Sequence, residues 1–234
     1  MALINLRNAL MAGKRTPTAQ DYVQDGLIAM WDGIENAGWS VHDPNATTWK
    51  NLIGDTAWDM TVPAAWQNDG LYFDGTWCGK APKTSETAIT MECVCDPVVA
   101  NFPMAFGWSY QGGVKRYSLL SNASSSLLRC YVGNSVFDGV FSATAHSYAV
   151  VIGATQSKIF VDGVLSSTST SAVGVSGETS NRFRLGGYGT RTDGDASGFF
   201  YKGHVQNFRI SIGELTADEI AANYAIDKAR FNLP

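Results

Sequence analysis

The chain has 234 residues, of which 45% are hydrophobic and only 16% charged, and it is rich in glycine and tryptophan. This composition is typical of a globular, turn-rich protein and excludes an extensively disordered chain or a coiled coil. The formal net charge of −4 provides no basic surface for nucleic acid or for an anionic membrane. No apolar run is long enough to cross a bilayer, so we expect neither nucleic acid nor a membrane as a partner.

Residues 1–24 differ in composition from the rest of the chain, and we predict a short helix followed by an extended linker. Pro17 marks the end of the helical pattern, and the apolar residues before it recur at helical spacing: Leu3, Leu6, Leu10 and Met11. An isolated helix of this length is marginal in water, so it must pack against something. Its own domain and another subunit both stay open as the partner, and the second would make this segment a docking arm.

The same N-terminal stretch does not resemble a signal peptide. Arg7 interrupts its apolar residues, and the basic pair Lys14 and Arg15 follows them, whereas a signal peptide places its positive charges first. We therefore expect that the chain does not leave a cell by the secretory route.

Residues 26–212 are predicted to be almost entirely strands and turns. Ten segments carry the pattern of strands: GLIAMWD, GLYFDG, AITMECVC, RYSLLS, LLRCYVG, SYAVVIGA, SKIFVDG, VLSSTS, RFRLGGY and HVQNFRIS. The dipeptide Asp-Gly occurs seven times without a fixed period, which indicates chain reversals and excludes a repeat array. In KIFVDGVLSS, Asp162 is accordingly predicted to be a hairpin residue and not a ligand, because a type I′ turn needs positive φ at both central positions.

The segment TAITMECVC is predicted to be a strand whose residues alternate between two faces. Alternation places Cys93 and Cys95 on one face with Ile89 and Met91, and Glu92 on the other. Residues i and i+2 on a strand lie about 6.5–7 Å apart, which is too far for a comfortable disulfide. We therefore predict buried free thiols, and the isolated histidines give little support to a zinc site.

The segment LTADEIAANYAIDKARF predicts a C-terminal helix over residues 216–230. Thr216 can cap it, Glu219 completes a capping box, and Leu215 with Ile220 makes a hydrophobic staple. The residues predicted to form its buried stripe follow helical spacing: Ile220, Tyr224 and Phe231.

Several segments, taken in order, carry a resemblance to one family: GLIAMWDG, LYFDG, AITMECVC, HSYAVVIGATQSKIFVDGVLSSTS, RFRLGGY and YKGHVQNFRISIGELTADEIAANYAID. They resemble the concanavalin A-like lectin/glucanase superfamily, and within it the laminin-G-like, pentraxin-like jelly rolls. The resemblance covers about residues 25–227 and implies an all-β fold, a two-sheet antiparallel jelly-roll sandwich. We therefore expect a jelly-roll domain over residues 25–234, ending in the C-terminal helix and preceded by the arm of residues 1–24.

The family contains both enzymes and binding proteins, so the fold alone does not give the function. Its glucanase members carry Glu-x-Asp-x-x-Glu on one strand, and this sequence has no such run. The nearest acids, Glu92 and Asp96, lie four residues apart with no third acid following, and no other hydrolase motif occurs. We therefore expect no enzymatic activity, with a glycoside hydrolase as the less favoured alternative.

Many relatives bind glycans or proteins, often with calcium, and two loops could supply such a site. Sugars bind by stacking on aromatic rings, while a few neighbouring polar groups fix their orientation. The candidate ligand-binding residues are Trp39, His42 and Trp49 in the long connection over residues 34–69, and Tyr188 and Arg191 in GGYGTRTDGDASG. Calcium, a hard ion that prefers oxygen ligands, is possible at Asp193 and Asp195. The alternatives stay open: the tryptophans could roof the core, and the two aspartates could belong to an ordinary hairpin loop.

The apparent lack of a secretion signal suggests a location for a lectin-like domain. A virion protein is assembled in the host cytoplasm and released by lysis, and the opening LINLRNALMAGKR resembles the start of phage structural or tail-associated proteins. We therefore hypothesise a capsid decoration, fibre or tail component that docks on other virion proteins through its N-terminal segment and adheres to glycans of a host surface. A free carbohydrate-binding module, acting outside cells or on a cell surface, is the alternative, and the number of copies that assemble stays open.

Overall fold

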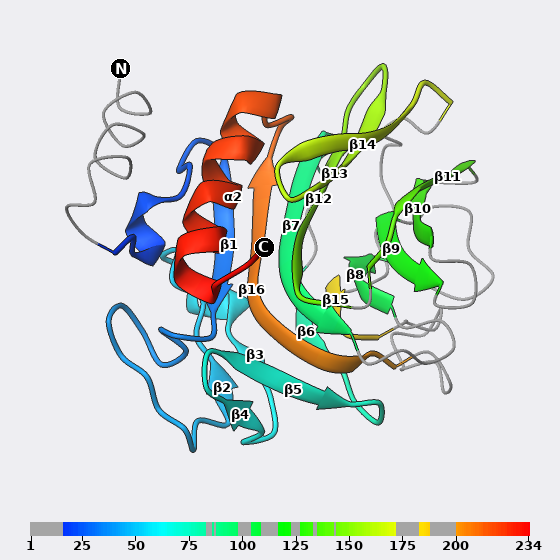
Figure 1. Cartoon of the computed structure of the whole chain (residues 1–234). Helices are drawn as coiled ribbons and strands as arrows, with labels where there is room; N and C mark the ends of the chain where they lie inside the picture. Colours follow the sequence, from blue (N-terminus) through cyan, green and yellow to red (C-terminus); the bar gives the residue numbers. More distant parts are fainter. Residues whose placement is uncertain are drawn as a thin grey trace.

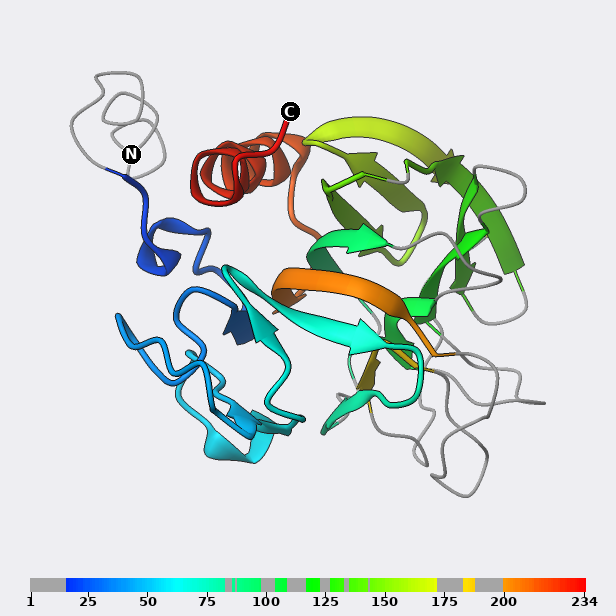
Figure 2. The ribbon, with the colours of Figure 1, turned by 60° about the horizontal axis from the view of Figure 1, so that its bottom comes forward.

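The computed structural model describes residues 16–82, 86, 88–97, 104–108, 117–122, 127–132, 135–142, 144–171, 183–187 and 200–234, with the backbone alone for 104–108 and 117–122. Within these residues the chain forms two antiparallel sheets packed face to face (Figure 1). An α-helix covers the outer face of the larger sheet, so that helix and smaller sheet lie on opposite sides of it (Figure 2). This is the jelly-roll sandwich that the sequence predicts.

The larger sheet has eight described strands, and the long strand β16 lies at its centre. The order along the sheet is β14 (Val164–Ser169), β13 (Ser157–Val161), β12 (His146–Ile152), β7 (Ile89–Pro97), β16 (Lys202–Ile212), β5 (Gly70–Asp74) and β4 (Trp66–Gln67). Strand β1 (Leu27–Asp32) also pairs with β16, next to β5 along the same edge. A register shift between Val205 and Asn207 separates the part of β16 that follows β5 from the part that follows β1.

The smaller sheet has six described strands in the order β11 (Ser135–Val140), β10 (Leu127–Val132), β9 (Tyr117–Asn122), β8 (Met104–Trp108), β15 (Phe183–Leu185) and β6 (Gly79–Ala81). A separate ribbon pairs β2 (Thr48–Trp49) with β3 (Met60–Thr61). The remaining described elements are the 3₁₀ turns η1 (Ala19–Asp21) and η2 (Thr56–Trp58) and the helix α2 (Ala217–Phe231).

Each of the ten strand segments predicted from the sequence contains a strand, and the predicted turn at Asp162 is confirmed. Asp162 and Gly163 join β13 to β14 with φ of 50° and 73°, as a two-residue type I′ turn requires. Asp138 corrects the interpretation of another Asp-Gly step, because it lies inside β11 and does not reverse the chain. There it faces Arg129 of β10, and the two side chains form a bidentate ion pair of 2.8 and 3.0 Å that favours an aspartate in a strand.

Strand β7 has the two faces that alternation predicts. Ile89, Met91, Cys93 and Cys95 lie in the core between the sheets, and the cysteines are buried free thiols. Glu92 points to the opposite face, where α2 covers it. Both faces of this strand are therefore buried, one apolar and one polar.

Helix α2 begins as its sequence predicts, but its buried face differs in part from the predicted stripe. Thr216 Oγ1 accepts a hydrogen bond from the Glu219 backbone N–H at 3.3 Å, and Glu219 Oε2 accepts one from the Thr216 N–H at 2.8 Å, which completes the capping box. Ile220 and Phe231 are buried, but Tyr224 is only partly so. The face toward the sheet also carries two buried polar residues that the stripe did not predict: Asn223 and Asp227.

Candidate functional site

A group of buried charged side chains lies between α2 and the outer face of the larger sheet. We call it the buried charge cluster: Asp32, Glu35, Glu92, Arg209, Asp227 and Arg230. Arg209 donates to both carboxylate oxygens of Glu92 and of Asp227 and to the Asn207 side-chain oxygen, at 2.7 to 3.3 Å. These five hydrogen bonds engage all five N–H donors of a guanidinium, and the group also lies 3.9 Å from the centre of the Tyr22 ring.

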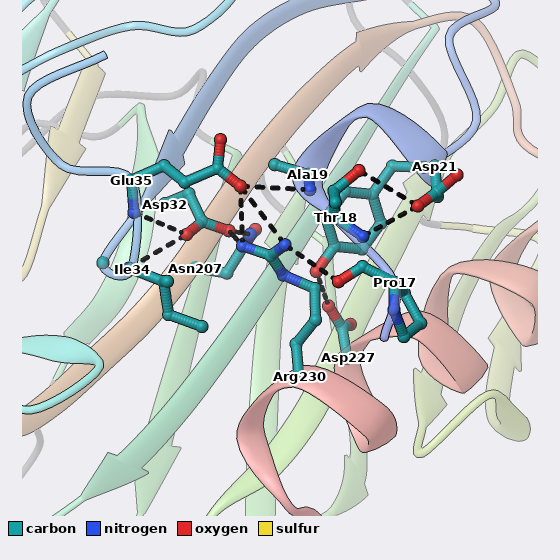
Figure 3. A network of polar contacts seen from close by, with 12 residues as sticks. Pro17, Thr18, Ala19, Asp21, Asp32, Ile34, Glu35, Asn207, Asp227 and Arg230 are labelled. Atoms are coloured by element: carbon teal, nitrogen blue, oxygen red, sulfur yellow. Dashed lines mark hydrogen bonds and ion pairs between the residues drawn. The ribbon is translucent and has the colours of Figure 1, made fainter. Parts of the chain in front are cut away.

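Residues 16–24 form a strap that closes the cluster on one side (Figure 3). Arg230 of α2 donates to Asp32 at 2.8 Å, to Glu35 at 3.3 Å and to the backbone carbonyl of Pro17 at 3.3 Å. Tyr22 donates its hydroxyl to Asp227 at 2.8 Å. The strap, the helix and the sheet are therefore joined through shared charged groups.

The buried charge cluster has a structural role, since its acids have almost no contact with solvent. Glu92 is 2% exposed and Asp32 is 0% exposed. Burial raises the pKa of both carboxyls, and the neighbouring arginines, Arg209 and Arg230, oppose this rise. Glu92, one of the two acids that come nearest to the glucanase motif in the sequence, thus faces α2 and not an open groove.

Asp162 has a second role besides its turn. Its side chain accepts a hydrogen bond from the Ser147 backbone N–H at 3.0 Å and lies 2.5 Å from His146 Nδ1. The other ring nitrogen of His146 lies 3.1 Å from the Thr144 hydroxyl. These contacts fasten the β13–β14 hairpin to the start of β12.

The outer face of the smaller sheet carries two basic residues on adjacent strands. Phe183 and Leu185 belong to the core, so alternation places Arg184 between them on the outer face. Ala81 is likewise in the core and its neighbour Lys80 points outward. Arg184 and Lys80 are direct register partners of β15 and β6, the first fully buried and the second partly exposed.

A pocket of about 450 Å³ opens beside Lys80, where η2, β3 and β6 meet. This volume is within the range of about 300–1,000 Å³ that small-molecule sites occupy. Its lining combines an aromatic ring with hydroxyl, ammonium and carboxylate groups: Asp59, Thr61, Thr76, Trp77 and Lys80. A lining of this kind suits a small ring-shaped ligand with several polar groups.

Two contacts hold the pocket's larger side chains in place. The Trp77 ring stacks on the buried ring of Phe73, with centroids 4.2 Å apart and planes inclined by 17°. Asp59 pairs with Lys50 at 2.6 Å and accepts a hydrogen bond from the Asn51 backbone N–H at 2.8 Å. The pocket is thus largely preformed, which lowers the entropic cost of binding.

A family model described as the concanavalin A-like lectin/glucanases superfamily matches residues 101–221, slightly more than half of the chain. The chain belongs to this superfamily. The resemblance drawn from the sequence is thereby confirmed at this level. No curated protein sequence matches the chain.

Solved structures with a similar fold include the sialidase of Trypanosoma rangeli, with a TM-score of 0.64 and 16% sequence identity. The match covers 97% of this chain but only 38% of the sialidase chain. The CBM40 of the Ruminococcus gnavus IT-sialidase, bound to α2,3-sialyllactose, matches 66% of this chain and 96% of its own, with a TM-score of 0.51 and 15% identity. At these levels of sequence identity, the comparisons establish that the chain shares its fold with these two proteins.

The structure describes three of the residues predicted for ligand binding, and they differ in their access to solvent. Trp39 is 37% exposed and His42 is exposed, its Nδ1 lying 3.1 Å from the Gly33 carbonyl oxygen, and both belong to one loop. Trp49 is fully buried, packs edge-on against Trp66 and donates its indole N–H to the Asp32 carbonyl oxygen at 3.0 Å. The prediction for Trp49 is therefore corrected: the Trp49 side chain is part of the hydrophobic core, and a ligand cannot reach its ring.

The second predicted loop lies outside the described residues, with Tyr188, Arg191 and the calcium candidates Asp193 and Asp195. The predicted N-terminal helix, before residue 16, is also outside them. In the described part of the chain, no three His, Cys, Asp or Glu side chains gather in a way that would hold a metal ion. No helix among the described residues has the length and apolar character to span a bilayer.

The pocket residues Trp77 and Lys80 were not singled out from the sequence. Trp77 follows the predicted strand GLYFDG in a turn, and Lys80 stands in a strand of only three residues. A tryptophan in the turn after a strand is a weak signal, because it differs little from the four tryptophans of the preceding connection. Only the meeting of η2, β3 and β6 forms a pocket around these positions.

Proposed function

We propose that this chain is a carbohydrate-binding domain without catalytic activity of its own, and that its ligand occupies the pocket beside β6. The observation that carries the proposal is Trp77, an aromatic face held against Phe73 in a pocket of about 450 Å³ with hydroxyl groups on its wall. Sugars bind by stacking their apolar faces on such rings, while a few polar groups fix their orientation. The bound ligand of the CBM40 structure is a sialylated sugar, which supports glycans as the ligand class.

The absence of catalysis is part of this proposal. Most glycosidases, sialidases excepted, use two carboxyl groups that flank the scissile bond, about 5–9.5 Å apart depending on the mechanism. The candidate acid Glu92 is bound by Arg209 and Asn223 beneath α2, and Asp59 of the pocket is paired with Lys50. These pairings support binding over hydrolysis, and incubation with a panel of fluorogenic glycosides checks the point: turnover above that of a Trp77→Ala variant would contradict it.

The central experiment is a glycan array with the purified full chain, followed by calorimetric titration of any glycan that binds. Trp77→Ala should weaken binding by about 10- to 100-fold, as expected for the loss of a stacked aromatic ring. Thr61→Arg provides a second variant, since Thr61 is exposed and a long side chain there fills the pocket without disturbing the core. Trp39→Ala is the matched control, an exposed tryptophan in the other candidate loop.

The outcomes separate the two candidate surfaces. Loss of binding in Trp77→Ala and Thr61→Arg, with Trp39→Ala unchanged, supports the pocket. Loss in Trp39→Ala alone would move the site to the loop of Trp39 and His42. An array on which no glycan binds would refute carbohydrate binding itself.

We also propose, from the sequence resemblance of its opening, that the domain serves in a phage virion. Residues 1–15 would then dock on other virion proteins, and the strap of residues 16–24 would hold the C-terminal end of that segment beside α2. Truncation should stop at residue 15, because Pro17, Ala19 and Tyr22 contact the buried charge cluster. A chain lacking residues 1–15 should keep its melting temperature and fail to enter particles; entry at the level of the full chain would refute the docking role.

A further inference from the structure

The side chain of Asp59 belongs to the wall of the pocket. Met60 is fully buried in the core, and the chain is extended at Asp59. Alternation therefore turns Asp59 and Thr61, the two neighbours of Met60, away from the core. Both of them line the pocket. The Asp59 carboxylate thus lies on the side of the chain where the pocket opens.

The Asp59 carboxylate is held in place and can still accept further hydrogen bonds. Its Oδ2 accepts a hydrogen bond from the Lys50 ammonium at 2.6 Å, and its Oδ1 accepts one from the Asn51 backbone N–H at 2.8 Å. An ionised carboxylate offers about four lone-pair sites on its two oxygens. Within the described part of the chain each oxygen has one partner, so each can accept one more hydrogen bond from a ligand.

A second group of the wall also favours a ligand that donates hydrogen bonds. The Thr76 hydroxyl donates its hydrogen to Asp74 Oδ1 at 2.6 Å. Because a hydroxyl has only one hydrogen to donate, the Thr76 oxygen is left to accept a hydrogen bond from a ligand. Asp59 and Thr76 therefore both act as acceptors in the pocket that the Trp77 ring lines. This combination suits a ligand that carries several hydroxyl groups on a ring.

We propose that Asp59 determines the specificity of the pocket by accepting hydrogen bonds from two adjacent ring hydroxyls of one sugar, while Trp77 stacks on that ring. This inference rests on the proposed function and deepens it, because it assigns the class of ligand: a pyranose with free neighbouring hydroxyl groups. Each hydroxyl donates to one Asp59 oxygen. Hydrogen bonds to a charged group are stronger than those between neutral groups, so the loss of one hydroxyl weakens binding measurably.

The test is calorimetric titration of the full chain with three disaccharides: lactose, cellobiose and α1,2-mannobiose. Each ends in a sugar whose hydroxyls at carbons 2, 3 and 4 are free, so the 3-hydroxyl belongs to every adjacent pair. At least one disaccharide should bind, and its derivative that lacks the terminal 3-hydroxyl should bind about 10- to 100-fold more weakly, the ratio expected for one hydrogen bond to a charged group. The derivative that lacks the terminal 6-hydroxyl is the matched control and should keep the affinity of the parent compound.

Substitution of Asp59 tests the assigned residue. Asp59→Asn keeps the shape of the side chain but turns one acceptor oxygen into a donor, so the parent disaccharide and its 3-deoxy derivative should bind with nearly the same, reduced affinity. Lys50→Gln is the matched control, because it removes the ion pair and leaves the carboxylate, and it should keep the difference between the two compounds. A thermal melt establishes that each variant folds, and the comparison of ligands on the unmodified chain does not depend on either variant.

The outcomes separate this inference from the proposed function. Equal affinity for a parent disaccharide and its 3-deoxy derivative would overturn the inference and leave the proposed function in place, as would binding of array glycans but of none of the three disaccharides. A difference between the two compounds that survives Asp59→Asn would overturn the role of Asp59. A chain that binds no glycan of the array would overturn the proposed function itself, and this inference with it.

Discussion

Removing one negative charge from the buried charge cluster should cost a large part of the free energy of unfolding. Asp227 is fully buried and accepts four hydrogen bonds, two from Arg209, one from Tyr22 and one from Ser147, all between 2.7 and 3.0 Å. The perturbation is Asp227→Asn, which preserves the shape of the side chain. The amide keeps one acceptor oxygen and turns the other into a donor that faces the donors of Arg209 and Ser147.

The expected loss can be worked out from these contacts. One charge-assisted bond to Arg209 contributes about 1.5–3 kcal/mol and the bond to Ser147 about 0.5–1.5 kcal/mol. Their sum overlaps the loss of about 3–5 kcal/mol that is usual when one partner of a buried ion pair is removed. We therefore expect a decrease of about 3–4 kcal/mol, against a total of about 5–15 kcal/mol for a typical domain.

Urea denaturation at pH 7, followed by tryptophan fluorescence, measures this loss. The matched control is Asp218→Asn on the same helix, where the carboxylate is exposed in the first turn. Its interaction with the helix dipole is worth only about 0.3–1 kcal/mol. If the two substitutions lowered the free energy of unfolding by the same amount, the cluster would not stabilise the fold and the reasoning would be wrong.

Two further predictions concern the hairpin and the alkaline limit of stability. Asp162→Ala should lower the free energy of unfolding by about 2–3 kcal/mol, because alanine tolerates the φ of 50° poorly and cannot accept the hydrogen bond from the Ser147 N–H. Asp162→Asn should lower it by less than about 1 kcal/mol. Equal losses for the two variants in denaturant melts would refute the turn argument. Burial raises the pKa of the Cys130 thiol and of the Tyr22 hydroxyl well above their ordinary values of 9.0 and 10.0. Both groups bind a proton more tightly in the folded state than in the unfolded state. Their contribution to the free energy of unfolding is therefore fully present below about pH 8.5, and it falls above that pH by up to about 1.4 kcal/mol per pH unit for each group. Cys130→Ala should reduce the slope of stability against pH between pH 9 and 10, and an unchanged slope there would contradict the role of this thiol.

Local patterns predicted much of the fold because they depend on neighbours in the sequence. The two faces of β7, the cap at Thr216 and the turn at Asp162 follow from alternation, capping chemistry and backbone sterics. Asp138 did not obey the same rule, because the cross-strand partner Arg129 makes an aspartate favourable inside a strand. That partner is nine residues away and cannot be identified before the register is known.

The candidate site was harder to predict than the fold. In HVQNFRIS, polar residues alternate with apolar ones, which normally indicates a face toward water. Here Asn207 and Arg209 lie on a face that α2 covers, so the same pattern produces a buried cluster. The pocket likewise depends on Trp77 and Lys80 meeting η2 and β3, and no spacing in the sequence encodes that meeting.

The hydrogen bond from Tyr22 to Asp227 joins positions 205 residues apart. Contacts of such long sequence separation slow folding, since the chain must close a large loop before it gains their energy. During synthesis, the strap and the central strand β16 therefore leave the ribosome before α2 can cover them. Until α2 is in place, Arg209 lacks its partner Asp227, and the exposed strands of the nascent chain are open to aggregation.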